Sequence, residues 1–144
     1  MNKSEKNTII SFYKEAMCSF KISLMREVVK GEEITEIISN YNNIKSLTAL
    51  CNNLKVDISE YRFLSKSDLI IFLNATVNKK KMNYYFSVND LLKGDYTQLI
   101  KDTIRLEAVD ELLYMLEIAE YFNLITKNLH QLIRDELEEI LQKN

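Results

Sequence analysis

Proline is absent from this chain of 144 residues, and glycine occurs only twice, at Gly31 and Gly94. Proline ends or kinks helices and glycine weakens their interiors, so a chain nearly free of both has few of the usual means of making turns and catalytic loops. Apolar residues recur at steps of three and four along most of the sequence, which is the spacing of an amphipathic helix. We therefore expect an all-α fold, a compact bundle of about six or seven helices.

Composition and residue order favour one domain over residues 1–144. Hydrophobic residues make up 47% of the chain and charged residues 28%, enough to fill a core and to keep its surface hydrated. No linker rich in serine, glycine or proline, no internal repeat and no low-complexity tract divides the sequence.

The apolar spacing also predicts the individual helices. Gly31 ends the first helix, the asparagine-rich stretch 40–43 interrupts the second, and Asn123 is the expected break before the last. Ser65 and Asp68 form a capping pattern at the start of another helix. Helices are expected over about 4–30, 32–41, 44–54, 65–77, 95–123 (as one helix or two) and 126–142.

Residues 69–88 fit two structures. Leu69–Val77 is rich in branched and aromatic residues, which favour strands, and Asn78–Lys81 followed by Met82–Val88 would serve as the turn and return strand of a small β-hairpin. The capping pattern favours a helix. We expect the helix and keep the hairpin as the alternative.

Seven large apolar side chains on the periodic stripes are predicted to be buried: Phe20, Leu24, Leu50, Leu113, Leu116, Leu132 and Ile133. The leucine-rich stripe of the last helix either closes the core or forms a self-association surface. Closing the core is favoured because a domain of this size needs the buried area, and a homo-oligomer formed through the last helix is the alternative.

Residues that could carry chemistry are few. Cys18 and Cys51 each lie in an apolar helical stretch and are interpreted as core residues without a disulfide, and His130 is the single histidine. Glycine-rich phosphate loops, nucleophile elbows and metal-ligand pairs are missing. We expect no cofactor, no metal and no enzymatic activity.

The N-terminal segment contains neither the apolar core of a signal peptide nor a run of about 18 apolar residues. We expect no membrane association and a cytoplasmic location, in the host cytoplasm if the protein is encoded by a phage or virus. The abundance of Asn, Ile and Lys is typical of AT-rich bacterial, phage and large-virus genomes, so an accessory protein of a phage or virus is the associated expectation.

Charge is distributed unevenly. Residues 1–94 carry 14 basic and 10 acidic residues, a net charge of +4, whereas residues 95–144 carry 5 basic and 11 acidic residues, a net charge of −6. The most basic window is 45–81, and the acidic residues concentrate in the second half of the last helix, where the helix dipole disfavours them. The excess of acid in that helix predicts compensation, either by the basic first half or by a basic partner.

The basic window also carries a family resemblance. Ser46–Val56, a loop, and Ser65–Leu73 resemble the helix–extended-loop–helix element of SAP and Rho-N-like modules. In those modules a lysine and an acidic residue, here Lys66 and Asp68, precede a second helix that opens on a leucine and a branched residue. The resemblance covers residues 46–73, about a fifth of the chain, and implies a small helical pair that often contacts nucleic acid.

Two functions follow as hypotheses. The first is a small non-enzymatic regulator or inhibitor that occupies the surface of a protein partner. The second is a nucleic-acid-binding regulator that uses the 45–81 window, ranked lower because the chain is net negative. The residues predicted to contact a partner are Lys66, Lys79, Lys80, Lys81, Tyr84, Tyr85, Asp135, Glu138 and Glu139.

Overall fold

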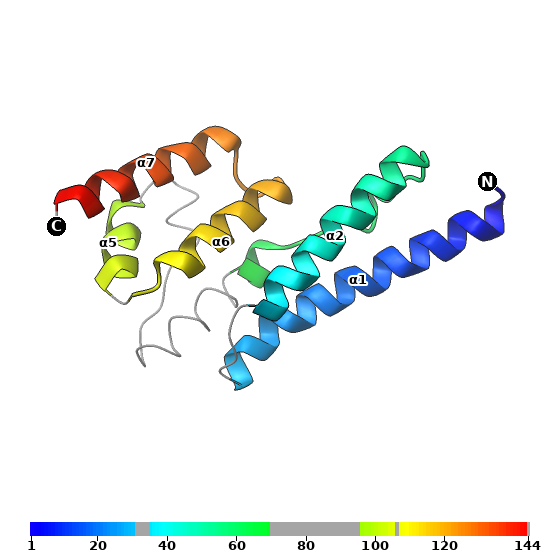
Figure 1. The fold of residues 1–144 in the computed structure, drawn as a ribbon, viewed down its shortest axis with the longest axis horizontal. Coiled ribbons are helices and arrows are strands. Elements are labelled where there is room, and N and C mark those ends of the chain that lie inside the picture. The colour runs from blue at the N-terminus through cyan, green and yellow to red at the C-terminus, as the bar shows by residue number, and fades with distance from the viewer. Residues whose placement is uncertain (31–34, 70–95, 106, 144) are drawn as a thin grey trace. The chain divides into compact units, whose positions relative to one another are not determined.

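The computed structural model describes residues 1–30, 35–69, 96–105 and 107–143. The chain divides into two compact units, unit 1 (Met1–Leu64) and unit 2 (Ser65–Asn144), which are seen in Figure 1. The described residues contain helices and no strand, which confirms the all-α prediction. The choice between helix and hairpin for residues 69–88 falls, apart from Leu69, outside the described residues, and the single-domain expectation stays a prediction.

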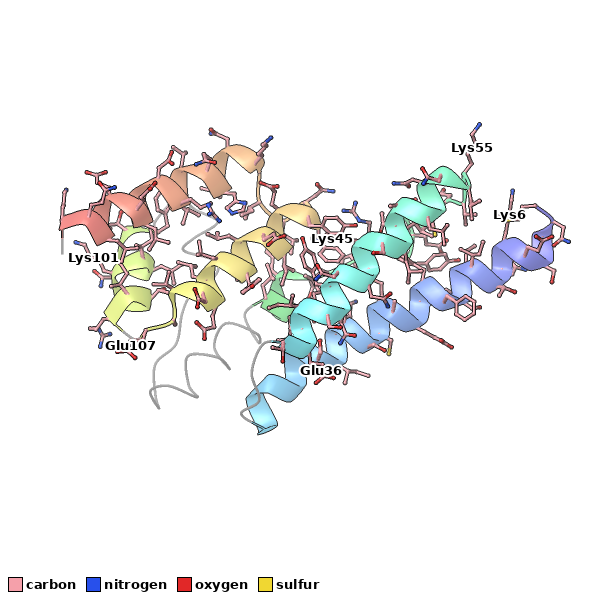
Figure 2. The ribbon with its side chains drawn as sticks, viewed as in Figure 1. Lys6, Glu36, Lys45, Lys55, Lys101 and Glu107 are labelled. Atoms are coloured by element: carbon pink, nitrogen blue, oxygen red, sulfur yellow. The ribbon has the colours of Figure 1, made fainter. Side chains whose placement is uncertain are left out.

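Unit 1 is built on an antiparallel pair of helices, α1 (Lys3–Lys30) and α2 (Thr35–Asn53) (Figure 1). Lys6 near the start of α1 and Lys55 beyond the end of α2 lie at the same end of the pair (Figure 2). The buried residues of α1 repeat at steps of three and four, as a helix packed on one side requires. These residues include Tyr13, Met17, Phe20 and Leu24.

The predicted break within residues 40–43 is wrong, because α2 runs without interruption from Thr35 to Asn53. Ile37, Tyr41 and Ile44 form one buried stripe across the stretch, and Tyr41 lies against Phe20 of α1 with 6.2 Å between ring centroids. Asparagine is a poor helix former by less than about 1 kcal/mol per residue, an amount that burial of these side chains outweighs.

The segment after α2 packs back along one side of α1. Lys14 lies 4.4 Å from the centre of the Tyr61 ring, and Lys21, seven residues further along α1, lies 5.2 Å from the centre of the Phe63 ring. Residues seven apart lie on the same side of a helix, so these two cation–π contacts align the segment with α1.

Unit 2 opens with a reciprocal capping box. The backbone N–H of Asp68 donates to Oγ of Ser65 at 3.2 Å, and the N–H of Ser65 donates to Oδ2 of Asp68 at 2.9 Å. The helical turn at residues 66–69 follows, with Leu69 buried. The predicted helix start at Ser65 is therefore confirmed.

Three helices make up the rest of the described part of unit 2: α5 (Thr97–Arg105), α6 (Val109–Tyr121) and α7 (Lys127–Lys143) (Figure 1). The last of them matches the predicted helix 126–142 to within one residue at each end. α6 and α7 are joined by the short turn at residues 122–126 and pack as an antiparallel pair, and α5 also contacts α7.

Three helices of the described chain, α2, α5 and α6, end in Schellman motifs that use no glycine. Lys55, Glu107 and Asn123 have φ angles of 58°, 56° and 61°, in the left-handed region that glycine usually occupies. In each case the next residue donates a hydrogen bond to a carbonyl five residues back, at 2.8 Å. Lys55, Glu107 and Asn123 thus take the place of glycine after α2, α5 and α6, respectively. The predicted break at Asn123 is confirmed.

The burial predictions are confirmed in part. Phe20, Leu24, Leu116 and Ile133 are buried, and Leu113 is half-buried. Leu50 and Leu132 are each 46% exposed, so their predicted burial is wrong. Each precedes a buried residue of the same helix, Cys51 and Ile133, and one step along a helix turns a side chain by about 100°. The predicted stripes were wider than the faces that the neighbouring helices cover.

Candidate functional site

A surface groove of about 490 Å³ lies along the seam between α6 and α7. We call it the α6–α7 groove and define it by its lining residues: Val109, Leu113, Gln131, Arg134, Asp135, Leu137, Glu138 and Leu141. Because the helices are antiparallel, the first half of α6 faces the second half of α7. The groove is part of unit 2 alone.

The floor of the α6–α7 groove is apolar. Leu137 is buried at its base, with 4% of its surface exposed, and Val109 and Leu113 are half-buried on the α6 side. Leu141 lies at the C-terminal end of α7 and is 44% exposed. The groove therefore presents aliphatic surface to solvent. Covering that surface with an apolar side chain of a partner would be favourable in free energy, because apolar area would be removed from water.

Two of the predicted partner-binding residues, Asp135 and Glu138, line this groove. Asp135 accepts a hydrogen bond from Nε2 of Gln131 at 2.9 Å. Glu138 is exposed, and within the described residues it forms no ion pair with Arg134, four residues before it. Glu138 therefore keeps its charge available on the rim of the groove.

The other acids of α7 have local partners. Oε1 of Glu136 accepts a hydrogen bond from the hydroxyl of Thr97 on α5 at 2.7 Å, and Glu139 lies 3.2 Å from Nζ of Lys143. The compensation expected for this acidic helix is thus supplied in part from within unit 2. Glu139, the third acid predicted to contact a partner, is exposed and lies outside the lining of the groove.

Of the basic and aromatic residues predicted to contact a partner, only Lys66 lies within the described residues. Lys66 is exposed in the first turn after the capping box. The predictions for Lys79, Lys80, Lys81, Tyr84 and Tyr85 lie outside the described residues. Among the described residues, Lys66 forms no ion pair with Asp135, Glu138 or Glu139.

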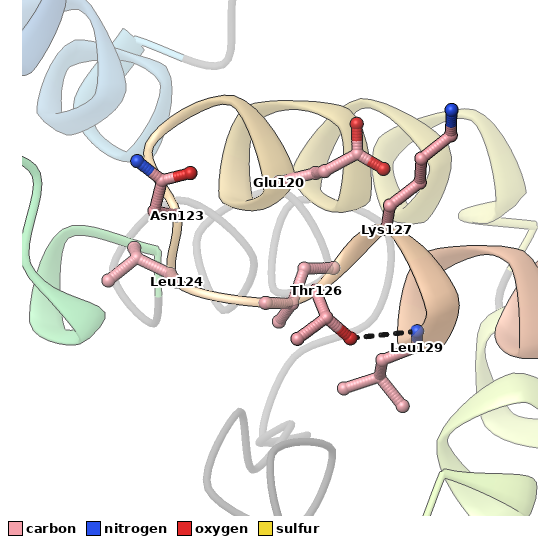
Figure 3. Close-up of a pocket in the computed structure, with 7 residues that line it drawn as sticks. Glu120, Asn123, Leu124, Thr126, Lys127 and Leu129 are labelled. Carbon is pink, nitrogen blue, oxygen red and sulfur yellow. Dashed lines mark hydrogen bonds between the residues drawn. The ribbon is translucent and has the colours of Figure 1, made fainter.

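A second hollow, of about 570 Å³, occupies the corner where α6 turns into α7 (Figure 3). Its polar groups serve the turn itself. Oγ1 of Thr126 accepts the backbone N–H of Leu129 at 3.0 Å and so caps α7, and Glu120 lies 3.1 Å from Nδ1 of His130. Because Thr126 and Glu120 are engaged in this way, we interpret the corner as a helix cap and assign it no ligand.

The residues considered for chemistry are not assembled into a site. Cys51 is buried, as predicted, and burial raises the pKa of its thiol, which disfavours the reactive thiolate. Cys18 is exposed, so its predicted place in the core is wrong. It follows the buried Met17 by one position and lies on the solvent-exposed side of α1. Both cysteines are free thiols.

Sequence reasoning missed the groove because it assigned Leu113 to the core and gave no separate role to Val109 and Leu141. One signal was available in the last helix. Leu132 and Leu141 are nine positions apart, which places them about 180° from each other around α7. An apolar arc that wide exceeds the single stripe that one packed face requires, and so indicates a second apolar surface.

Among the residues that the structure describes, no group of three or more His, Cys, Asp or Glu side chains could hold a metal ion. No helix there combines the length and apolar character that crossing a membrane requires. No protein-family model, curated protein or solved structure matches the chain.

Proposed function

We propose that this chain is a small non-enzymatic binding protein that acts as a regulator or inhibitor by occupying the surface of a protein partner. The observation that carries the proposal is the α6–α7 groove, an open channel lined by four aliphatic and four polar or charged side chains, with Asp135 and Glu138 among them. The cytoplasm, or the host cytoplasm for a phage or viral protein, is the compartment that we propose with it.

The shape of the groove favours a macromolecule over a metabolite. Small-molecule sites usually enclose most of their ligand in a concave, largely apolar pocket. Here five of the eight lining residues are exposed: Gln131, Arg134, Asp135, Glu138 and Leu141. A metabolite in this groove would keep much of its surface in water, whereas a protein partner would cover the groove and its rim together.

The nucleic-acid alternative stays a prediction. In the described part of the 45–81 window, Lys45 lies 4.5 Å from the centre of the Tyr41 ring of its own helix. Asp57 and Glu60 are exposed in the same window, where they would repel phosphates. These features do not favour a nucleic-acid surface on residues 45–69, the described part of the window, and the experiment must distinguish nucleic-acid binding from protein binding.

Affinity purification with the tagged chain tests the proposal, using three proteins in parallel: the natural sequence, Leu141→Ser in the groove, and Leu132→Ser on the opposite side of α7. A specific protein partner should survive nuclease treatment, disappear with Leu141→Ser and remain with Leu132→Ser. Recovery that nuclease abolishes would favour the nucleic-acid alternative. In that case the logarithm of the binding constant for nucleic acid should fall with the logarithm of the salt concentration, with a slope of about 0.9 per phosphate contact. Equal recovery by both leucine variants would overturn the assignment of the groove.

A further inference from the structure

We propose that the α6–α7 groove binds one amphipathic helix of a protein partner, with lysine or arginine on both sides of its apolar stripe. The inference rests on the proposed function and names the class of partner.

The length of the groove suits a short helix. Its lining residues on α7 extend from Gln131 to Leu141, ten steps along the helix, or about 15 Å at 1.5 Å per step. A partner helix of about three turns covers that distance and presents apolar side chains at positions i, i+3 or i+4, and i+7. Val109, Leu113 and Leu137 provide the apolar surface against which those side chains would pack.

Acidic residues border the groove on both helices. On α7 the acids are Asp135 and Glu138, which belong to the lining itself. On α6, Asp110 precedes Leu113 by three positions and Glu117 follows it by four, so both lie on the same side of the helix as Leu113, and both are exposed. A helix lying in the groove would thus have carboxylates along both of its sides.

The surrounding charge points to a cationic occupant. Arg134 is the single basic residue among the eight that line the groove. Residues 96–143 carry 5 basic and 10 acidic residues, so the field around the groove attracts cations and repels phosphates. Such complementarity mainly raises the rate of association and selects the partner, while the buried apolar contacts hold the complex together.

The other modes of peptide binding fit less well. Addition of a strand needs an exposed sheet edge, and the described part of unit 2 has no strand. A proline-rich segment needs an aromatic-lined groove, and this lining contains no aromatic residue. An amphipathic helix in an aliphatic groove is the mode that remains.

Fluorescence anisotropy with three labelled synthetic peptides of about 14 residues tests the proposal. The first has leucines at helical spacing with lysines elsewhere, the second keeps the leucines and replaces lysine with glutamate, and the third is the first with its leucines scrambled. The full-length chain should bind the first peptide, should not bind the second, and should bind the third much more weakly.

Protein variants then locate the site. Leu141→Ser should weaken binding of the leucine–lysine peptide about tenfold by removing apolar contact, and Leu132→Ser should leave it unchanged. Combined Asp135→Lys and Glu138→Lys should abolish that binding and allow the leucine–glutamate peptide to bind. Circular dichroism of each variant checks that the helices are retained. Of the four substituted positions, all except Leu132 line the groove, and none of the four is buried.

Several results would overturn the inference. Equal binding of the scrambled peptide would reduce the effect to general attraction by an acidic surface, and equal loss from both leucine variants would move the site elsewhere. Sedimentation that reveals a dimer dissolved by Leu141→Ser would make a second copy of the chain the occupant. A protein partner that depends on Leu141 in the purification, with no binding of the leucine–lysine peptide, would leave the proposed function standing and refute the helix.

Discussion

Replacing Lys55 with glycine should stabilise the protein, because Lys55 occupies the left-handed region with φ of 58°. A residue with a Cβ atom loses about 1–2 kcal/mol in that region through contact with its own backbone. Glycine removes the clash but has about 0.5–1 kcal/mol more backbone entropy to lose on folding. The difference leaves a net gain of about 0.5–1 kcal/mol in the free energy of unfolding.

The surroundings of Lys55 make this position a clean test. Its side chain is exposed, and within the described residues it forms no ion pair or side-chain hydrogen bond. The hydrogen bonds of the Schellman motif come from the backbone, namely Lys55 N–H to Asn52 O at 3.2 Å and Val56 N–H to Cys51 O at 2.8 Å. Glycine retains both of them.

Urea denaturation measures the gain. With a slope of about 2 kcal/mol per molar, the midpoint of Lys55→Gly should rise by about 0.25–0.5 M. Lys55→Ala is the matched control, since it removes the same charge and side chain but keeps a Cβ atom in the left-handed region, and it should bring no gain. Asn123→Gly should gain less than Lys55→Gly because asparagine tolerates this region better. Equal stabilisation by glycine and alanine at position 55 would refute the conformational argument and attribute the effect to charge.

Three further variants address the core, a helix cap and pH. Leu116→Ala should lower the free energy of unfolding by about 2–5 kcal/mol, because the side chain is 0% exposed, while the exposed Leu132→Ala should change it by less than about 0.5 kcal/mol in denaturant melts. Thr126→Ala should cost about 1 kcal/mol in the same assay by removing the cap of α7. Hydrogen bonds from the hydroxyl and N–H of Ser59 lower the pKa of Asp57, so its contribution to stability is present above its unfolded pKa and is lost as pH falls through the lowered value. The free energy of unfolding, measured as pH is lowered, should therefore fall less in Asp57→Ala than in the natural sequence.

The helices were largely predictable because their signals are local. The capping box at Ser65, the break at Asn123 and the bounds of α7 each follow from residues within one turn of the feature. The continuity of α2 was not predictable in this way. It depends on Tyr41 packing against Phe20, twenty-one residues away in sequence, and local propensity at the asparagines argued for a break.

The candidate site was predictable only in its charges. Asp135 and Glu138 were identified from the excess of acid in the last helix, and the structure places both of them on the groove. The apolar floor could not be assigned, because a leucine such as Leu113 is core or surface according to how much of its helix the neighbours cover. The width of the apolar arc on a helix can be determined from the sequence. The part of that arc that stays exposed to solvent depends on how α6 packs against α7.

The left-handed helix ends also provide a test of the single-domain prediction, since Lys55 lies in unit 1 and Asn123 in unit 2. If both units unfold as one cooperative domain, Lys55→Gly and Asn123→Gly should each raise the same thermal transition, by about 2–4 °C for a gain near 1 kcal/mol and by less for Asn123→Gly, and the double variant should show their sum. If the units unfold independently, calorimetry should resolve two transitions, with each substitution moving only the one that belongs to its own unit. Separate shifts would contradict the single domain expected from the absence of a linker, and would show that the segment between α2 and Ser65 separates two folding units without any glycine or proline.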